Sequence, residues 1–169
     1  MLEGKGAILD VARRVSRLLE SQGSEGGVIG GVAVVLHGHI RTTSDVDVYM
    51  PEPLEAFGEQ LRSAGFSFNS AQREFTYTGV PVHLVTSEQT KVAPAEIVNI
   101  DEVRTVSLAD LINMKLHTGT QDMLRAQDLA DVIGLIRHHQ LSGEFARHVA
   151  KPLRNEFRKL ARAIRNESR

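Results

Sequence analysis

The segment DVDVYM, residues 45–50, alternates acidic with apolar side chains and is followed by two prolines. Successive side chains of a β-strand point to opposite faces, so the alternation predicts a strand that buries Val46 and Val48. Asp45 and Asp47 then share the other face, and the prolines end the strand. Two carboxylates on one exposed strand face can coordinate the same hard cation or two adjacent ones, and Mg²⁺ is a suitable ion.

Two glycines precede this strand at a turn. We expect a short buried strand ending at Gly30, a short helix over residues 32–37, and a polar loop through Arg41 and Thr43. A glycine pair lets the backbone approach a ligand closely, and the helix start after it presents free N–H groups. Gly30 and Gly31 therefore predict an anion site beside the carboxylates, an arrangement that suits phosphoryl or nucleotidyl transfer.

The rest of the chain predicts helices around a small sheet. Apolar residues at helical spacing indicate helices over 6–21, 54–64, 121–139 and 152–166. Ser107 is a candidate N-cap for a further helix over 108–118. Strands are expected in the β-rich stretch 66–86 and at 103–106, and residues 92–100 are not assigned.

This order of elements predicts an α+β fold, with a short mixed sheet flanked by helices and a helical C-terminal third. We expect residues 1–106 to form the core with the mixed sheet. Residues 107–169 are expected to form a helical region packed on that core.

Composition excludes several classes of protein. The 169 residues are 41% hydrophobic, carry a net charge of -1 and include no cysteine, which excludes disulfide frameworks and thiol nucleophiles. The longest uncharged stretch, residues 26–40, is too short to span a bilayer, so no membrane partner is expected. No secretory signal is visible at the N-terminus, and a cytoplasmic location is the expectation.

The stretch GGVAVVLHGHIRTTSDVDV, residues 30–48, resembles the motif of the nucleotidyltransferase superfamily, which has the DNA polymerase beta-like fold. Its Arg-x-Thr-x-Asp-x-Asp variant is similar to the small bacterial branch that includes AbiEii-type toxin nucleotidyltransferases. The resemblance implies that Gly30 and Gly31 hold a triphosphate and that Asp45 and Asp47 bind Mg²⁺ and are catalytic. Arg41 and Thr43 of the motif are then expected near the nucleotide.

A second block, residues 107–136, is similar to a later part of the same branch, where a helical lysine precedes an arginine and an Asp-x-x-Asp pattern. The matching positions are Lys115, Arg125, Asp128 and Asp131. We expect Lys115 to reach outward from its helix and to bind the phosphates, as a mobile point charge does. Arg125 and Asp128, three residues apart on one helix, can form an ion pair.

One position departs from the family pattern. Active members usually carry a third carboxylate on the neighbouring strand, and the matching stretch VPVHLVT has His83 there. Three interpretations remain open: His83 is the general base, it is a metal ligand that favours Mn²⁺, or the site has kept nucleotide binding and lost catalysis. Glu74, on the preceding strand, is a candidate for the missing carboxylate.

The C-terminal residues 151–169 carry seven Lys/Arg and two Glu, a net of +5, whereas the other 150 residues carry 13 positive and 19 negative side chains, a net of -6. The apolar stripe of this segment indicates a docked helix with a solvated basic face. The alternative is a contact with RNA or an acidic protein.

The leading hypothesis is therefore an enzyme that transfers a nucleoside monophosphate from a nucleoside triphosphate to an unknown acceptor. Mg²⁺, or alternatively Mn²⁺, is the expected cofactor, and the acceptor could be a small molecule, a tRNA or a protein. The alternative is a catalytically degenerate nucleotide-binding regulator or a toxin–antitoxin component. A third hypothesis is an α/β domain whose Asp-x-Asp pair is incidental.

Overall fold

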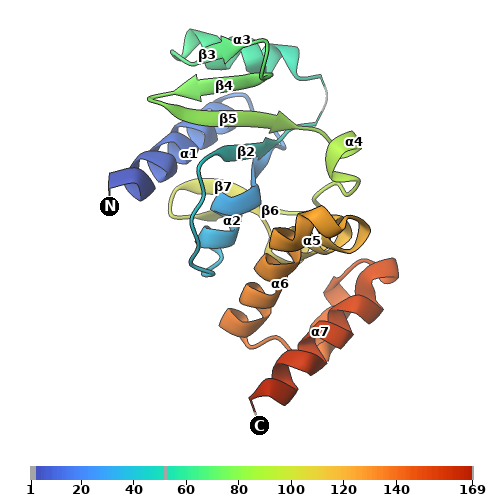
Figure 1. Cartoon of the computed structure of the whole chain (residues 1–169). Helices are drawn as coiled ribbons and strands as arrows, with labels where there is room; N and C mark the ends of the chain where they lie inside the picture. Colours follow the sequence, from blue (N-terminus) through green and yellow to red (C-terminus); the bar gives the residue numbers. More distant parts are fainter. Residues whose placement is uncertain (1–2, 52, 169) are drawn as a thin grey trace.

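A seven-stranded mixed sheet forms the centre of the computed structural model, which describes residues 3–51 and 53–168 (Figure 1). The strand order is β3-β4-β5-β2-β1-β7-β6. Two neighbouring pairs, β2 with β5 and β1 with β7, run parallel, and the other pairs run antiparallel. The predicted α+β class with a mixed sheet is confirmed. The strands are β1 (Gly27–Ile29), β2 (Val46–Tyr49), β3 (Ser67–Asn69), β4 (Glu74–Tyr77), β5 (Val80–Val85), β6 (Ile97–Ile100) and β7 (Val103–Val106).

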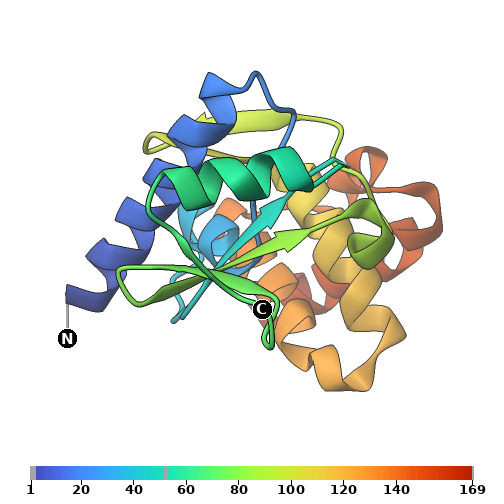
Figure 2. The same cartoon turned by 90° about the horizontal axis from the view of Figure 1, so that it is seen from above.

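Two hydrophobic clusters lie on opposite faces of this sheet. Consecutive residues of β2 point to opposite faces, so Val48 belongs to one cluster and Tyr49 to the other. The Val48 cluster is covered by α1 (Glu3–Ser21) and α3 (Glu55–Ser63), which cross the sheet on one side (Figures 1 and 2). The C-terminal helices cover the other face. Both helices of the first face agree with the predicted amphipathic segments, within a few residues at each end.

Two short elements connect the sheet to the site. The helix α2 (Gly30–Leu36) follows β1 at once and begins two residues earlier than predicted. It lies between the two clusters, with Val32 in one and Val34 in the other. The one-turn helix α4 (Ser87–Thr90) follows β5 and was not assigned from the sequence.

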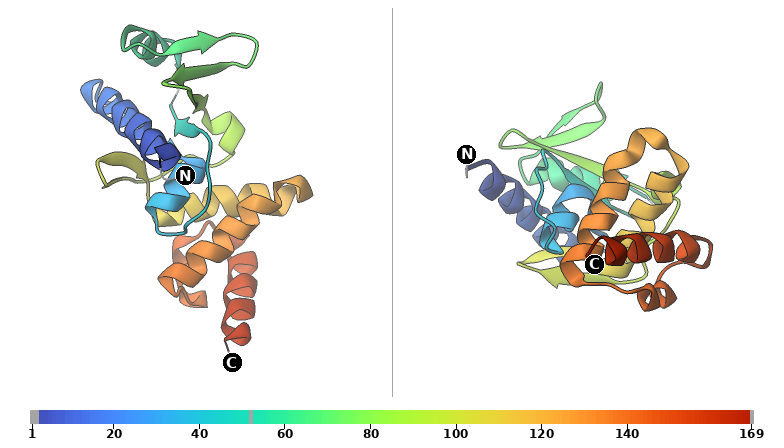
Figure 3. Two further views of the ribbon diagram at one scale, coloured as in Figure 1. Left: turned by 60° about the vertical axis from the view of Figure 1, so that its left-hand side comes forward. Right: turned by 60° about the horizontal axis from the view of Figure 1, so that its bottom comes forward.

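The C-terminal third is helical, as predicted, and its helices gather on one side of the sheet (Figure 3). Ser107 caps the first of them, because its Oγ accepts a hydrogen bond from the Asp110 amide at 3.2 Å. The predicted continuous helix over 121–139 is broken at Asp122, which has an extended backbone. The elements are α5 (Leu108–Gln121), η1 (Met123–Arg125), α6 (Ala126–His139), η2 (Gly143–His148), η3 (Lys151–Leu153) and α7 (Arg154–Glu167).

The last helix, α7, packs on the rest of the helical region through its apolar stripe. Phe157 is fully buried and Ala161 is 5% exposed, whereas the arginines of the helix face outward or lie at its edge. The predicted docking of this segment through its apolar stripe is confirmed. Across residues 3–51 and 53–168, no helix combines the length and the apolar character needed to cross a membrane.

Candidate active site

Asp45, which immediately precedes β2, and Asp47, which is on β2, lie in the middle of the sheet, where β2 runs between β1 and β5. Val46 and Val48 are fully buried, as the alternation predicted. The side chains of Asp45 and Asp47 are on the other face and are 36% and 29% exposed. Both acids are therefore accessible to a ligand, and the backbone of Asp47 is paired with a strand on each side.

The parallel pairing of β2 with β5 places His83 directly beside Asp47. The Nδ1 atom of His83 is 3.1 Å from Asp47 Oδ1 and 3.6 Å from Asp45 Oδ2. The other ring nitrogen, Nε2, is 3.0 Å from Glu74 Oε2 on β4. His83, which replaces the usual third carboxylate of the family, thus lies beside the aspartate pair. Each of its ring nitrogens faces an acidic side chain.

The electrostatics of this cluster are those of an acidic site. Burial and the adjacent Asp45 carboxylate raise the pKa of Asp47 above its usual value. Burial alone would lower the pKa of His83, but the hydrogen bonds to Glu74 and Asp47 and the nearby Asp45 outweigh it and raise that pKa. A cation at this point would relieve the repulsion between the two aspartates.

The donor set fits a divalent metal ion. Asp45, Asp47 and His83 each offer one ligand atom, and these atoms lie within 4.8 Å of one another. Two carboxylate oxygens and one imidazole nitrogen suit Mn²⁺ or a similar transition metal, and the carboxylates alone also suit Mg²⁺.

The glycine pair at the start of α2 is packed against the site residues. Gly30 has a φ of +65°, and a Cβ atom there would lie 2.3 Å from Asp47 Oδ2. A Cβ atom at Gly31 would lie 2.5 Å from Thr43 Oγ1 and 2.9 Å from an Arg41 nitrogen. No larger residue fits at either position without displacing a site residue. The fold therefore brings both glycines, Arg41, Thr43 and Asp47 together.

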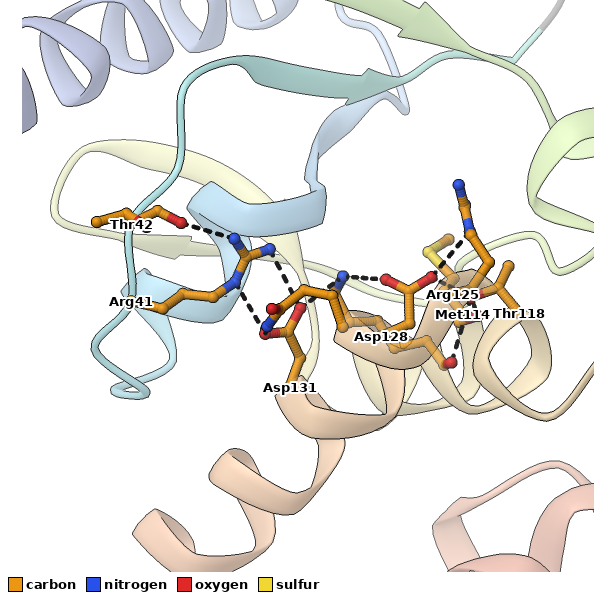
Figure 4. A network of polar contacts seen from close by, with 9 residues as sticks. Arg41, Thr42, Met114, Thr118, Arg125, Asp128 and Asp131 are labelled. Carbon is orange, nitrogen blue, oxygen red and sulfur yellow. Dashed lines mark hydrogen bonds and ion pairs between the residues drawn. The ribbon is translucent and has the colours of Figure 1, made fainter. Parts of the chain in front are cut away.

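The two predicted phosphate-binding cations are joined through one buried acid, Asp131 (Figure 4). Its side chain is fully buried and forms ion pairs with Arg41 Nε at 2.8 Å and Lys115 Nζ at 2.9 Å. The expectation that Lys115 reaches outward was wrong, because Lys115 is 7% exposed. Two acids on α6 draw the ammonium group inward, and α5 and α6 pack closely around it.

Asp128 completes this network on the cleft side (Figure 4). It accepts hydrogen bonds from Lys115 Nζ at 2.7 Å and Thr118 Oγ1 at 2.8 Å, and it pairs with Arg125 Nε at 3.1 Å. Burial alone would raise the pKa of Asp128, but Lys115, Thr118 and Arg125 together lower it below the usual value. The predicted Arg125–Asp128 ion pair is confirmed.

These groups surround a cleft of about 810 Å³ between the sheet and the C-terminal helices. Seven of the predicted site residues line it, namely Gly30, Gly31, Arg41, Thr43, Asp45, Asp47 and Lys115. His83 is not part of the lining, since it contacts the carboxylates from the side of β5. Gln89, Thr118 and Gln127 also line the cleft, and nothing in the sequence distinguishes them from ordinary polar helix residues.

No protein-family model matches the chain, and no curated protein matches its sequence. Solved structures share its fold at low identity. A putative nucleotidyltransferase from H. pylori has a TM-score of 0.59 at 15% identity, covering 95% of this chain and 94% of that chain. ANT(2")-Ia, solved in complex with adenylyl-2"-tobramycin, has a TM-score of 0.57 at 12% identity, covering 95% and 98%.

A third neighbour is an antigenic nucleotidyltransferase-like protein from Paracoccidioides brasiliensis. Its TM-score is 0.58 at 17% identity, with 76% of this chain and 74% of that chain covered. The chain therefore has the fold of nucleotidyltransferase-like proteins.

Proposed function

We propose that the protein transfers a nucleoside monophosphate from a nucleoside triphosphate to an acceptor in this cleft. The observation that carries the proposal is the position of Asp45 and Asp47, opposite Lys115 and beside the Gly30–Gly31 helix start, in one cavity. A site of this kind has acids for a metal ion on one wall and cations for phosphates on the other. Solved structures with this fold include a putative nucleotidyltransferase, which agrees with the proposal, but the proposal depends on the residues of the site.

Asp45 and Asp47 would hold the metal ion, Mg²⁺ or Mn²⁺, which when bound would neutralise charge on the phosphate oxygens. The close approach of Gly30 and Gly31 lets phosphate oxygens reach the backbone N–H groups at the start of α2. Lys115 uses two of its three N–H bonds on Asp128 and Asp131, which leaves one for a phosphate. Arg41 and Thr43 would close the loop side of the phosphate site.

His83 is best explained as a third ligand of the metal ion, with Glu74 as the group that holds it. With a metal ion bound, a hydrogen bond from Nε2–H to Glu74 would fix the tautomer, and the Nδ1 lone pair would be directed at the ion in place of the present contact with Asp47. This role fits the position of His83 beside the carboxylates better than a general base does, since His83 does not line the cleft.

We also propose that the chain is related to the AbiEii-type branch. Lys115, Arg125, Asp128 and Asp131 match the pattern of the AbiEii-type branch, and the ion pairs among them give that pattern a structural role. A nucleoside triphosphate donor agrees with a cytoplasmic location. The acceptor would meet the donor in the same cleft.

Calorimetric titration of ATP, CTP, GTP and UTP, each with Mg²⁺ or Mn²⁺ and each with EDTA, tests the proposal. We expect at least one nucleotide to bind only with the metal, and pyrophosphate to appear when extracts containing acceptors are added. If no nucleotide binds under any condition, the proposed function is wrong, and the Asp-x-Asp pair is incidental.

A second candidate is nucleotide binding without transfer, in a regulator or a toxin–antitoxin component. It is favoured by His83 in place of the usual third carboxylate, with both nitrogens already held by acids. The same titration separates the two functions. Metal-dependent binding with no pyrophosphate release from any acceptor pool would support the regulator and contradict the enzyme.

We expect His83→Ala to lower Mn²⁺ affinity about 10- to 100-fold, because the site would lose its nitrogen ligand. His83→Asp should restore binding but shift the preference toward Mg²⁺, since a third carboxylate replaces the imidazole. Mn²⁺ electron paramagnetic resonance measures both affinities, and nitrogen coupling to Mn²⁺ should vanish in both variants. His148→Ala, which alters an exposed histidine on η2, is the matched control. Equal Mn²⁺ affinity in His83→Ala and His148→Ala would exclude His83 as a ligand.

A further inference from the structure

A second large hollow, of about 1080 Å³, lies between the end of α6, η2 and α7, away from the candidate active site. Five arginines line it and define what we call the arginine groove: Arg137, Arg147, Arg158, Arg162 and Arg165. All five are exposed, and only one acid, Glu144, lines the same hollow. The groove thus concentrates positive charge on a chain whose net charge is -1.

Most of this charge is not neutralised within the protein. Arg137 pairs with Glu167. For Arg147, Arg158, Arg162 and Arg165, no carboxylate lies within ion-pair distance among residues 3–51 and 53–168. Four guanidinium groups held near one another repel, so a bound anion would stabilise the groove.

The arginines of α7 are spaced for a row of phosphates. Arg158, Arg162 and Arg165 are separated by four and three residues, so they follow one side of the helix at intervals of about 6 and 4.5 Å along its axis. These intervals are nearer to the separation of neighbouring phosphates along an A-form RNA strand than to the longer one along B-form DNA. Arginine also matches phosphate geometry with two parallel hydrogen bonds.

The other lining groups favour RNA over a protein partner. Gln140, Ser142 and Ser168 add hydrogen-bond donors of the kind that contact phosphate and sugar. Protein interfaces depend on apolar or aromatic anchors that become buried. The apolar residues that line the groove, Ile136, Leu141, Ala161 and Ile164, belong to the hydrophobic core or are partly buried against it, so they are not free to act as exposed anchors.

We propose that the arginine groove binds the phosphate backbone of an A-form RNA segment. The contacts are to phosphates and do not read base sequence, because no aromatic side chain lines the groove for stacking. The groove and the cleft lie at opposite ends of α6, where Asp128 and Arg137 are nine residues, about 14 Å, apart along the helix. The proposal is independent of the proposed function, because RNA can bind here whether or not the cleft transfers nucleotides.

Fluorescence anisotropy with a labelled RNA hairpin tests the proposal on the full chain. We expect the affinity to fall steeply with salt, with a slope between about -3 and -4 in log K against log salt for four neutralised phosphates. In Arg158→Glu/Arg162→Glu the affinity should fall at least tenfold and the slope should approach half that value. A DNA duplex of the same sequence should bind more weakly than the RNA.

The control is Arg17→Glu/Arg73→Glu, which makes the same change in net charge at exposed positions on α1 and next to β4. This control should keep most of the RNA affinity, and far-UV circular dichroism should show that both variants are folded. Equal losses in the two double variants would overturn the proposal, as would DNA binding as tight as RNA. Displacement of the RNA by equimolar polyglutamate would also overturn it and would indicate an acidic protein partner. Nucleotide titrations in the cleft should be unchanged in both double variants.

Discussion

Replacing Asp45 and Asp47 together by asparagine is expected to abolish metal-dependent nucleotide binding and to lower nucleotidyl transfer by about a thousandfold or more. The asparagines keep the size of the side chains but remove the two charges that would hold the cation. A bound metal ion contributes several kcal/mol to neutralising phosphate charge, and each 1.4 kcal/mol corresponds to about a factor of ten. The loss should exceed that for any single residue of the phosphate side, because no other acid lines that wall of the cleft.

The same substitution should leave the fold intact. The pKa of Asp47 is raised by burial and by Asp45, which means that the two carboxylates repel in the metal-free protein at neutral pH. Removing both charges removes this repulsion, so the free energy of unfolding should not fall by much. Titration calorimetry and urea unfolding on one preparation measure the two effects. Asp10→Asn/Asp101→Asn, at exposed positions remote from the cleft, is the matched control. Unchanged nucleotide affinity in a folded Asp45→Asn/Asp47→Asn protein would refute the site.

Local patterns of the sequence were sufficient for the strand that carries the acids. Val46 and Val48 are buried and the aspartates share the opposite face because alternation is a property of consecutive residues. The glycine pair was predicted for a similar reason, since the positive φ of Gly30 and the close approach at both glycines are backbone requirements. The cap at Ser107 also depends only on residues nearby in sequence.

Long-range pairings could not be predicted in the same way. The contact between Glu74 and His83 depends on the register of two strands, which the turn between Tyr77 and Val80 sets. Thr78 in that turn has a φ of +50°, which is unusual for threonine. The sequence therefore did not indicate the two-residue hairpin turn, which usually has Asn, Asp or Gly at this position. Reading Thr78 and Gly79 as that turn would have placed the two residues opposite each other.

Lys115 shows the same limit on a helix. Its apolar neighbours Leu111, Ile112 and Leu116 face the core. Lys115 was expected to reach outward. Its partner Asp131 lies 16 residues later and is joined in turn to Arg41, so the pattern of the helix did not reveal the pairing. Only tertiary packing of α5 on α6 brings these charges together, and helical spacing contains no information about it.

Asp131→Ala is expected to lower the free energy of unfolding by about 3–5 kcal/mol, the usual cost of leaving a buried charge without its partner. The side chain of Asp131 is fully buried, and the substitution removes the acid shared by Lys115 and Arg41. It also removes the acceptor for Gln127 Nε2, which lies 3.0 Å from Asp131. Urea unfolding followed by circular dichroism should show the midpoint falling by more than about 1 M.

Two further variants test whether the loss of stability in Asp131→Ala comes from the unpaired charges. Asp128→Ala should cost less, about 1–2 kcal/mol, because Asp128 is 15% exposed at its side chain and Lys115 keeps Asp131 as a partner. In the double variant Lys115→Met/Asp131→Ala, the buried ammonium is absent, so the total loss should be smaller than the sum of the single losses by about 0.5–3 kcal/mol. Additive losses, or an Asp131→Ala protein within 1 kcal/mol of wild type, would show that Asp131 does not hold the two cations. Because Asp131 anchors Arg41 and Lys115 on the wall of the cleft that faces Asp45 and Asp47, its loss should also weaken nucleotide binding in the protein that remains folded.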